Sequence, residues 1–556
     1  MKIPSKNFII KTFSIIVIIL ISNSQVMSQN TVGLIMNDKS QSFDGYTLFA
    51  PNLAKFTYLI DNDGNLVHQW ESDFIPGMSV YLLEDGNLLR AAAIKNPNNN
   101  RTGGFELFDW DNKLLWQFYH GTQHHDIEYL PESGNVLMVV NDPRNKNLAI
   151  QAGRDPDLID DDVNIIRSTS ILEIKKTGDD TGDIVWQWNA WDHLIQEFDS
   201  TKDNFGVVAD HPELIDINFA RDGGADWLHT NSVAYNAELD QIMVSNRGND
   251  EIWVIDHSTS TVQAASHDGG NSNKGGDLLY RWGNPSAYDA GTDSDQIFYG
   301  QHDVHWIEPN LQGAGNIMIF NNGWPDRGYS SIEEIVPPVD VNGNYTLVTG
   351  SAYEPSAQLW TYTTPTQTDF SSDRFGGSQR LPNDNTLICN SDKGEFFEVT
   401  LDNEIVWKYQ NPVDGATILQ EGAQPVGNLQ VFRCYKYAPE YPGFNGKTLI
   451  SGVPLKVNNE LIDVISFKLL DNYPNPFNPI TNIEFALSER TFVNITVFDM
   501  LGNKVKILES KSMEPGTKSI TWDSKDDKGT LVSSGVYFYN LQAGQQNQTK
   551  KMMLLR

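Results

Sequence analysis

Short apolar runs, rather than long amphipathic stretches, set the pattern of hydrophobic and polar positions along this 556-residue chain. Many runs alternate apolar and polar residues and end in Asp, Asn or Gly, as at residues 58–65, 105–112, 171–178 and 396–403. Alternation with a period of two is typical of a half-buried strand, and the terminal Asn or Gly is typical of a hairpin turn. Together with 43 Gly and 25 Pro, this pattern predicts an all-β protein.

A degenerate tetrapeptide organises these hairpins into a repeat. It has the form apolar, aromatic, any residue, aromatic, and it follows the strand-and-turn pattern of a hairpin. The six copies are residues 67–70, 115–118, 185–188, 279–282, 359–362 and 406–409. Their unequal spacing indicates a repeat with loop insertions of variable length.

A second signature, two apolar strands around a polar Gly or Asn turn, precedes the hairpins. It is found at residues 81–89, 127–137, 233–244, 304–319 and 380–388. Two hairpins per unit make a four-stranded β-propeller blade, so six units predict a six-bladed β-propeller, which we place at residues 29–452. An open β-solenoid or tandem sandwiches are the alternatives, because the insertions blur the period.

The two ends of this region are each incomplete. The hairpin at 56–70 has no inner pair of strands, and the strand at 427–434 has no outer pair. We therefore expect the two ends to complete one blade and to close the ring.

The charge of the chain restricts its partners. Asp and Glu number 72 against 40 Lys and Arg, which gives a formal net charge of −32. Such a surface repels phosphate backbones and anionic lipid heads, so nucleic acid is a poor candidate partner. A concave site with local basic groups is still able to receive an anion, because local geometry governs such a site.

The first 28 residues have the pattern of a secretory signal peptide. Three lysines precede the apolar run 14–21, and small or polar residues follow it. That run is too short to span a bilayer, and no later segment is long enough, so we expect no transmembrane segment in the mature protein. Cys389 and Cys434 are the two cysteines, and in an oxidising compartment they are equally consistent with one disulfide and with two buried thiols.

The composition changes beyond a linker at residues 453–471, and residues 472–556 have the pattern of a small Ig-like β-sandwich. Several of its motifs, such as Tyr-Pro-Asn-Pro-Phe-Asn-Pro at 473–479 and Lys-Lys-Met-Met-Leu-Leu-Arg at 550–556, resemble the C-terminal sorting domain of type IX secretion cargo. The resemblance implies recognition by the type IX secretion machinery, export through the outer membrane, and release or attachment at the cell surface. An ordinary adhesive module is the alternative.

Histidines recur at one position of the inner-strand signature. Aligning the signatures places His125 and His302 at the same position as Asn231, with His229 two residues before Asn231. In a propeller, the residue that begins the innermost strand faces the central channel, so we expect these side chains to meet there. His124 would point to the opposite face and is the weaker candidate.

Arg247 ends the strand that follows His229 and Asn231, and its guanidinium could hold a tetrahedral oxyanion. A salt bridge with Asp250 or Glu251 is the structural alternative. The histidines themselves are consistent with two chemistries: three imidazoles could bind a transition metal, or one neutral imidazole could act as a nucleophile. Asp126 and Asp303 follow two of the histidines and are better explained as orienting groups.

Four motifs carry a family resemblance: residues 123–126, 229–231, 245–247 and 301–303 resemble the active-site motifs of bacterial arylsulfotransferases that use no nucleotide sulfate donor. The resemblance covers about residues 40–440. It implies that a phenolic sulfate ester gives its sulfuryl group to one histidine, and that a phenolic acceptor then takes it. It makes His302 the nucleophile, surrounded by the residues that match the family's supporting groups, His125, His229, Asn231 and Arg247. It implies no cofactor and no metal.

Three other functions suit a propeller of this composition: a quinone-dependent dehydrogenase with a calcium site, a glycan-binding propeller without activity, and a metal-dependent lactonase or lyase in which the histidines are ligands. The acidic stretch 155–162 is oxygen-rich enough for calcium but is better explained as a solvated insertion. The natural donor and acceptor are set by loops and cannot be inferred from these motifs.

Overall fold

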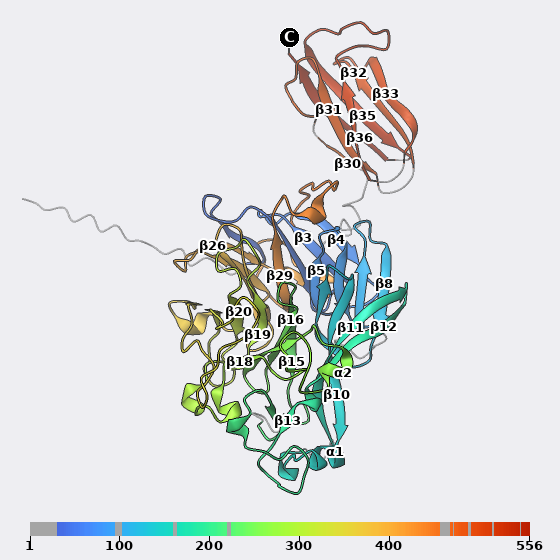
Figure 1. Ribbon diagram of the computed structural model, residues 1–556. Helices are drawn as coiled ribbons and strands as arrows, with labels where there is room; N and C mark the ends of the chain where they lie inside the picture. The colour runs from blue at the N-terminus through green and yellow to red at the C-terminus, as the bar shows by residue number, and fades with distance from the viewer. Residues whose placement is uncertain are drawn as a thin grey trace, which may run out of the picture.

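The computed structural model describes residues 31–94, 103–159, 164–219, 224–455, 468–470, 472–487, 491–513, 516–544 and 546–555. Strands dominate these residues, and the two α-helices among them are short, α1 (Lys146–Gln151) and α2 (Thr261–Ala264). The chain is therefore an all-β protein, as the sequence predicts (Figure 1).

Six antiparallel sheets make up the larger part of the chain. From inner to outer strand, the first three are β29 (Val431–Tyr437), β2 (Tyr46–Pro51), β3 (Phe56–Ile60) and β4 (Leu66–Glu71); β5 (Pro76–Leu82), β6 (Leu88–Ala92), β7 (Gly104–Phe108) and β8 (Leu114–Tyr119); and β9 (Gln123–Leu130), β10 (Asn135–Asn145), β11 (Ile165–Gly178) and β12 (Thr181–Asn189).

The other three sheets are β15 (Thr230–Asn236), β16 (Gln241–Asn246), β17 (Glu251–Asp256) and β18 (Tyr280–Trp282); β19 (His302–Trp306), β20 (Ile317–Asn321), β21 (Ser331–Ile335) and β22 (Trp360–Tyr362); and β23 (Gly377–Arg380), β24 (Thr386–Asn390), β25 (Glu395–Val399) and β26 (Ile405–Gln410), with β1 (Gly33–Asn37) added beyond β26. Two small pairs, β13 (Leu194–Ile195) with β14 (Ile215–Asp216) and β27 (Val413–Asp414) with β28 (Thr417–Ile418), lie in connections.

The two ends of the region meet in one sheet, as predicted. β29 pairs with β2, so the C-terminal side contributes the inner strand and the N-terminal side contributes three strands. The expected division into two and two strands was wrong, because β2 was not recognised as a strand. Its segment 46–51 is apolar on both faces and lacks the alternation that marks the hairpins.

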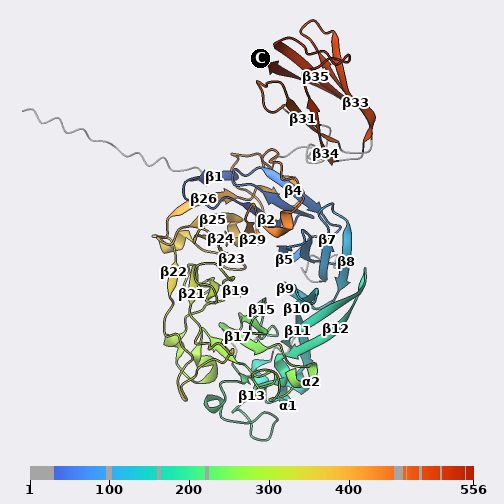
Figure 2. The ribbon, with the colours of Figure 1, turned by 45° about the horizontal axis from the view of Figure 1, so that its top comes forward.

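Inner strands of successive sheets contact one another in a closed series, from β5 through β9, β15, β19, β23 and β29 back to β5. In Figure 2 these strands lie toward the middle of the sheets, and outer strands such as β8, β12 and β22 lie toward the rim. The first residues of the inner strands are thereby brought together from distant parts of the sequence.

The tetrapeptide repeat marks the last strand of each hairpin pair, and its tryptophans join neighbouring sheets. Each repeat places one indole N–H on a backbone carbonyl of the following sheet. The six donor and acceptor pairs are Trp70 and Asp109, Trp116 and Thr181, Trp188 and Gly276, Trp282 and Pro355, Trp360 and Leu401, and Trp407 and Asn62. We call these six hydrogen bonds the tryptophan latches between sheets. Because the last pair returns to the first sheet, they also join the two sheets at which the series closes.

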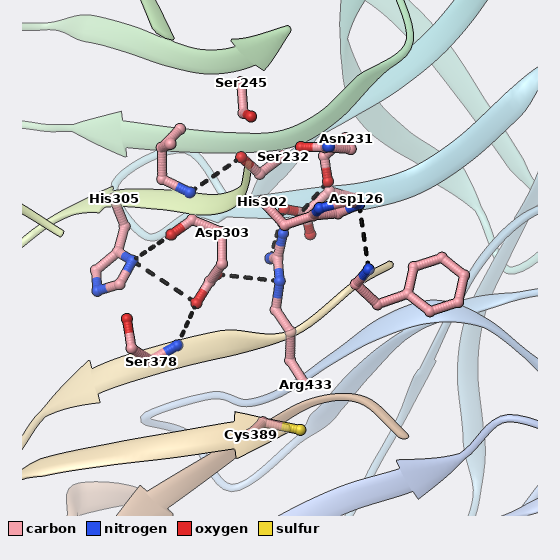
Figure 3. A network of polar contacts seen from close by, with 12 residues as sticks. Asp126, Asn231, Ser232, Ser245, His302, Asp303, His305, Ser378, Cys389 and Arg433 are labelled. Atoms are coloured by element: carbon pink, nitrogen blue, oxygen red, sulfur yellow. Dashed lines mark hydrogen bonds and ion pairs between the residues drawn. The ribbon is translucent and has the colours of Figure 1, made fainter. Parts of the chain in front are cut away.

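A second set of links joins the inner strands. Asp126 on β9 accepts the backbone N–H of Val233 on β15 at 3.2 Å. The Ser232 hydroxyl on β15 accepts that of Val304 on β19 at 3.2 Å, and Asp303 on β19 accepts that of Ser378 on β23 at 2.8 Å (Figure 3). Asp126, Ser232 and Asp303 occupy the same aligned position, so that position links neighbouring strands.

Arg433 on the closing strand β29 joins these links at the centre. Its guanidinium makes ion pairs with Asp126 at 2.7 Å and Asp303 at 3.0 Å, and it donates to the Asn231 carbonyl at 3.3 Å (Figure 3). Although burial disfavours the charged form, the two carboxylates hold the pKa of Arg433 well above its usual value. One buried cation therefore connects four inner strands.

The C-terminal part consists of two antiparallel sheets, one of β30 (Lys468–Leu469), β31 (Thr481–Leu487) and β34 (Gly516–Trp522), and one of β33 (Lys504–Met513), β32 (Thr491–Phe498), β35 (Gly535–Ala543) and β36 (Gln546–Leu554). Apolar side chains of both sheets share one buried cluster that includes Ile483, Ile495, Trp522 and Tyr539. This arrangement agrees with the expected two-layered unit.

Some expectations concern residues outside the described part. The signal peptide at 1–28, most of the linker at 453–471 and part of the acidic stretch at 155–162 belong to this group. No helix of the described residues is long and apolar enough to cross a membrane. Cys389 and Cys434 are both buried free thiols, and burial together with the neighbouring Cys434 raises the pKa of Cys389 well above its usual value.

We expect Arg433→Met to lower the free energy of unfolding by about 3 kcal/mol or more, because it leaves two buried carboxylates without their cation. Chemical denaturation of the full chain measures this change. Arg144→Met is the matched control, because Arg144 pairs with Asp142 at a partly exposed position and such pairs contribute less than about 1 kcal/mol. Adding Asp126→Asn and Asp303→Asn to Arg433→Met should restore part of the lost free energy of unfolding. Equal effects of Arg433→Met and Arg144→Met would contradict the role given to the buried Arg433.

Candidate active site

A cavity of about 400 Å³ lies where the inner strands begin. Three predicted histidines and the predicted arginine line it together with five further residues: Met78, His125, His229, Arg247, His302, Trp324, Asp373, Arg374 and Phe375. The imidazole of His125 is central, with ring centroids 5.0 Å from His229 and 6.5 Å from His302. The structure thus brings together four of the five predicted site residues.

The fifth predicted residue, Asn231, is fully buried and is not among the residues that line the cavity. Its Nδ2 donates to the carbonyl of Gln301, the residue before His302, at 2.8 Å. Asn231 therefore holds the backbone that presents His302. His124, the weaker candidate, is also buried outside the cavity lining, and its Nδ1 lies 2.8 Å from Nδ1 of His125.

Unusual backbone conformations place the histidines. His125 and His229 have φ of 54° and 46°, and Asp303, next to His302, has φ of 52°. Few residues other than glycine adopt this left-handed region, and such residues gather at functional sites. The ladders of β9 and β19 shift register where His125 and Asp303 lie, and His229 directly precedes β15. The three imidazoles thus line the cavity while the strands continue to pair.

The ring of His302 is held in one orientation and one tautomer. Nδ1 lies 2.7 Å from Oδ1 of Asn322 and 3.0 Å from the Gly300 carbonyl, and both oxygens only accept. The amide of Asn322 is itself fixed, because Nδ2 donates to the carbonyls of Ser372 and Phe375, each at 2.7 Å. Nδ1 of His302 must therefore carry the hydrogen, which leaves Nε2 unprotonated, with a lone pair.

Burial lowers the pKa of His302 well below its usual value, and the positive charges of Arg247 and Arg433 add to this shift, while the hydrogen bond to Asn322 opposes it. Burial and the neighbouring His229 likewise lower the pKa of His125 well below its usual value. Both imidazoles are therefore neutral near pH 7, and His302 presents an uncharged Nε2. The backbone N–H of Phe375 donates to that atom at 3.3 Å, so this hydrogen bond has to break before Nε2 can attack.

His229 has a carboxylate partner, Asp226, whose Oδ2 lies 2.6 Å from Nδ1 of the imidazole. Burial alone would raise the pKa of Asp226, but the hydrogen bond with His229 and nearby positive groups lower it to about 2. An ionised carboxylate at Nδ1 orients the ring and stabilises an imidazolium, so that Nε2 of His229 is suited to proton transfer.

Two guanidinium groups face the cavity. Arg247 lies over the ring of Trp324, with its Cζ 5.1 Å from the ring centroid. Glu251, one of its two alternative salt-bridge partners in the sequence, is instead paired with Arg281 inside the protein. Arg374 is an exposed residue of the lining.

Sequence reasoning missed Asp226, Asn322, Arg374 and Phe375. Asn322 follows strand β20, and residues 373–375 precede strand β23, so neither belongs to the aligned inner-strand motif. Asp226 could have been found, because a carboxylate three residues before a candidate histidine is a possible partner. Asn322 could have been found too, because it directly follows β20, the strand that pairs with β19 in the same sheet. Nothing in the sequence places residue 375 beside residue 302, because only the packing of two sheets brings it there.

A family model described as arylsulfotransferase matches residues 32–414, and one described as a secretion system C-terminal sorting domain matches residues 471–555. No curated protein matches the chain. Similar solved structures include a protein of unknown function from Bacteroides caccae, which is 10% identical, with 71% of this chain and 98% of that chain covered at a TM-score of 0.38. A streptogramin B lyase is 10% identical, with 74% and 95% covered at a TM-score of 0.33.

A protein from Lactobacillus plantarum is 9% identical, with 86% of this chain and 100% of that chain covered at a TM-score of 0.35. Such low scores support no argument about this chain. The sorting domain indicates that the protein is exported and then secreted or attached to the cell surface. Since the first family model matches well over half of the sequence, the chain belongs to the arylsulfotransferase family and carries a type IX secretion sorting domain at its C-terminal end.

Proposed function

We propose that the protein is a nucleotide-independent arylsulfotransferase that moves a sulfuryl group from a phenolic sulfate ester to a phenolic acceptor through a sulfated His302. The observation that carries the proposal is the cavity itself, in which a neutral, oriented imidazole lies among two further histidines and two arginines. The proposal needs no nucleotide, metal or other cofactor.

The proposed architecture is a six-bladed β-propeller at residues 29–452, a linker at 453–471 and an Ig-like sorting domain at 472–556. The six sheets, the closed series of contacts between inner strands and the six tryptophan latches support the propeller. In this architecture the cavity is one end of the central channel.

The cavity selects an anion in a protein that is otherwise strongly acidic. Arg247 and Arg374 line it against a single carboxylate, Asp373, while the whole chain has a net charge of −32. Met78, Trp324 and Phe375 supply apolar and aromatic surface in the same cavity. This combination suits an aryl sulfate, whose ring packs on apolar groups and whose sulfate binds to guanidinium donors.

His302 attacks sulfur with the Nε2 lone pair, and the bond between sulfur and the phenolic oxygen breaks. The imidazole then carries a positive charge, which the Nδ1 hydrogen shares with Oδ1 of Asn322 and the Gly300 carbonyl. The N–H of Phe375 gives up its hydrogen bond to Nε2 as the bond to sulfur forms, and it is then placed to donate to an oxygen of the transferred group. Arg247 is placed to stabilise the remaining oxygens. Direct contact of Asn231 with these oxygens stays a prediction.

The phenolate leaves with help from a neighbouring histidine. His229 is the candidate for this role, because its Nδ1 faces the ionised Asp226, whereas burial keeps His125 neutral. Phenols have a pKa near 10, so modest assistance is sufficient. In the second half-reaction His229 removes the proton of the acceptor phenol. The phenol oxygen then attacks sulfur, and the bond between sulfur and Nε2 of His302 breaks.

The first test is sulfuryl transfer from 4-nitrophenyl sulfate to an added phenol by the full chain in the presence of chelator. His302→Ala should lower the rate by at least about a thousandfold, since it removes the nucleophile. His305→Ala, on the same strand but outside the cavity lining, should retain most of the activity. Inactivity of the folded wild type across donors and acceptors would favour the alternative, a secreted ligand- or glycan-binding propeller. Activity that is present without chelator and lost when chelator is added would indicate that the histidines are metal ligands.

The pH dependence of the first half-reaction tests the state of His302. An ordinary histidine loses its neutral form below a pH of about 6.5. Because the pKa of His302 is lowered, its neutral form persists through that range, so the initial burst of nitrophenol should keep its rate as the pH falls through about 6.5. The burst is measured by rapid quenching into base. A burst rate that halves at a pH of about 6.5 would contradict a buried, neutral nucleophile.

A further inference from the structure

A second histidine cluster lies outside the cavity and has no role in the proposed reaction. His193 follows the short 3₁₀ turn η2 (Ala190–Asp192) after strand β12, whereas His267 and Asp277 enclose a glycine-rich segment between α2 and β18. One ligand atom from each of these three residues lies within 4.8 Å of the other two, and within the described part of the chain no other group of three His, Cys, Asp or Glu side chains does so.

The distances within the cluster are short. Oδ1 of Asp277 lies 2.8 Å from Nδ1 of His193 and 2.7 Å from Nδ1 of His267. The side chain of His193 is fully buried and that of Asp277 is 8% exposed, whereas that of His267 is 63% exposed. One carboxylate oxygen therefore faces two imidazole nitrogens, with solvent reaching the cluster from the side of His267.

Hydrogen bonding fixes the orientation of the His193 ring, with Nδ1 facing the carboxylate of Asp277. Its Nε2 lies 2.9 Å from the carbonyl of Ala264, which only accepts, so Nε2 carries a hydrogen. In a neutral imidazole Nδ1 then has a lone pair, and that lone pair faces the Asp277 carboxylate. Two acceptors at 2.8 Å repel each other unless a proton or a metal ion lies between them.

The loop is shaped for this close approach. A side chain at Gly276 would place its first carbon 2.6 Å from Nε2 of His193 and 2.1 Å from the Ala264 carbonyl, so only glycine fits there. The same Gly276 accepts the indole N–H of Trp188, one of the six latches between sheets. The cluster therefore lies at the junction of the third and fourth sheets.

We propose that His193, His267 and Asp277 form a binding site for a divalent transition metal ion of the zinc class, with water completing the coordination. Two imidazoles and one carboxylate favour such an ion over calcium or magnesium, which prefer oxygen ligands. Metal–ligand bonds of about 2.0 to 2.1 Å in a tetrahedron separate neighbouring ligand atoms by about 3.3 Å. Both contacts to Asp277 have to lengthen by about half an ångström. The exposed ring of His267 can make this adjustment on its side, whereas on the side of the buried His193 the Asp277 carboxylate has to turn.

The bound metal ion crosslinks two sheets. It joins the end of the third sheet, through His193, to the insertion before β18 in the fourth sheet, through His267 and Asp277. No residue of the cluster lines the cavity, so metal should change the stability of the chain without being required for turnover.

The test uses the full chain, freed of metal by chelator and dialysed, with Zn²⁺ alone as the probe. Calorimetric titration should give one site, and Zn²⁺ at about a hundredfold excess over Kd should raise the melting temperature by about 4 °C or more. Co²⁺ should give d–d absorption with nitrogen and oxygen ligands. Mg²⁺ and Ca²⁺ should produce no shift.

His267→Ala removes an exposed ligand and so keeps the fold, and it should weaken Zn²⁺ binding at least about tenfold. Asp277→Asn should do the same. His211→Ala is the matched control, because His211 pairs with Glu213 at an exposed position without a third ligand, and it should bind as the wild type does. The proposal would be overturned if the chain did not bind Zn²⁺, or if His267→Ala bound it as tightly as the wild type. It would also be overturned if His302→Ala lost binding instead, which would place the metal in the cavity.

Discussion

The buried charge of Arg433 between Asp126 and Asp303 is the interaction on which the rest of the structure depends. Removing an ion from water costs several kcal/mol, and the cost is offset only when both carboxylates are in place. The three residues come from β29, β9 and β19, and β29 is the strand through which the end of the region joins its beginning. Because Asp126 and Asp303 directly follow His125 and His302, the network that closes the ring also fixes the positions of two cavity histidines.

Adjacent positions of the inner strands have different roles, one toward the candidate site and one toward the neighbouring strand. The first aligned position supplies His125, Asn231 and His302, and the next supplies Asp126, Ser232 and Asp303, whose oxygens accept backbone hydrogens from the following strand. His125 and His302 thus line the cavity and Asn231 holds the backbone before His302, while the next position on each strand links it to its neighbour. The tryptophans make the corresponding links at the rim.

The sequence predicted features that repeat and missed features that occur once. Hairpins, tetrapeptides and the aligned histidines recur, so alignment within the chain predicted the all-β class and the cavity residues His125 and His302. His229 and Arg247 were found from their places beside an aligned strand. Phe375 and Arg433 occur once, on elements whose approach to residues 126 and 302 depends on how the sheets pack. Asn322 also occurs once, just beyond β20, which pairs with β19 in the same sheet. Alignment predicted that Asn231 lies near His302 but not that it lies behind His302, outside the cavity lining. Alignment gives the position of a residue along a strand and not the direction of its side-chain amide.

Charge and hydrogen bonding together explain why His302 differs from an ordinary histidine. Burial and nearby arginines keep it neutral, while Asn322 and Gly300 hold its Nδ1 hydrogen and leave Nε2 directed into the cavity. Peptide mass spectrometry of the full chain, treated with an aryl sulfate in the absence of acceptor and digested under neutral or basic conditions, tests this account most directly. The account predicts one added sulfuryl group, located on His302 and lost when a phenol is added. A sulfuryl group on another residue, or transfer activity without any sulfated enzyme, would contradict it.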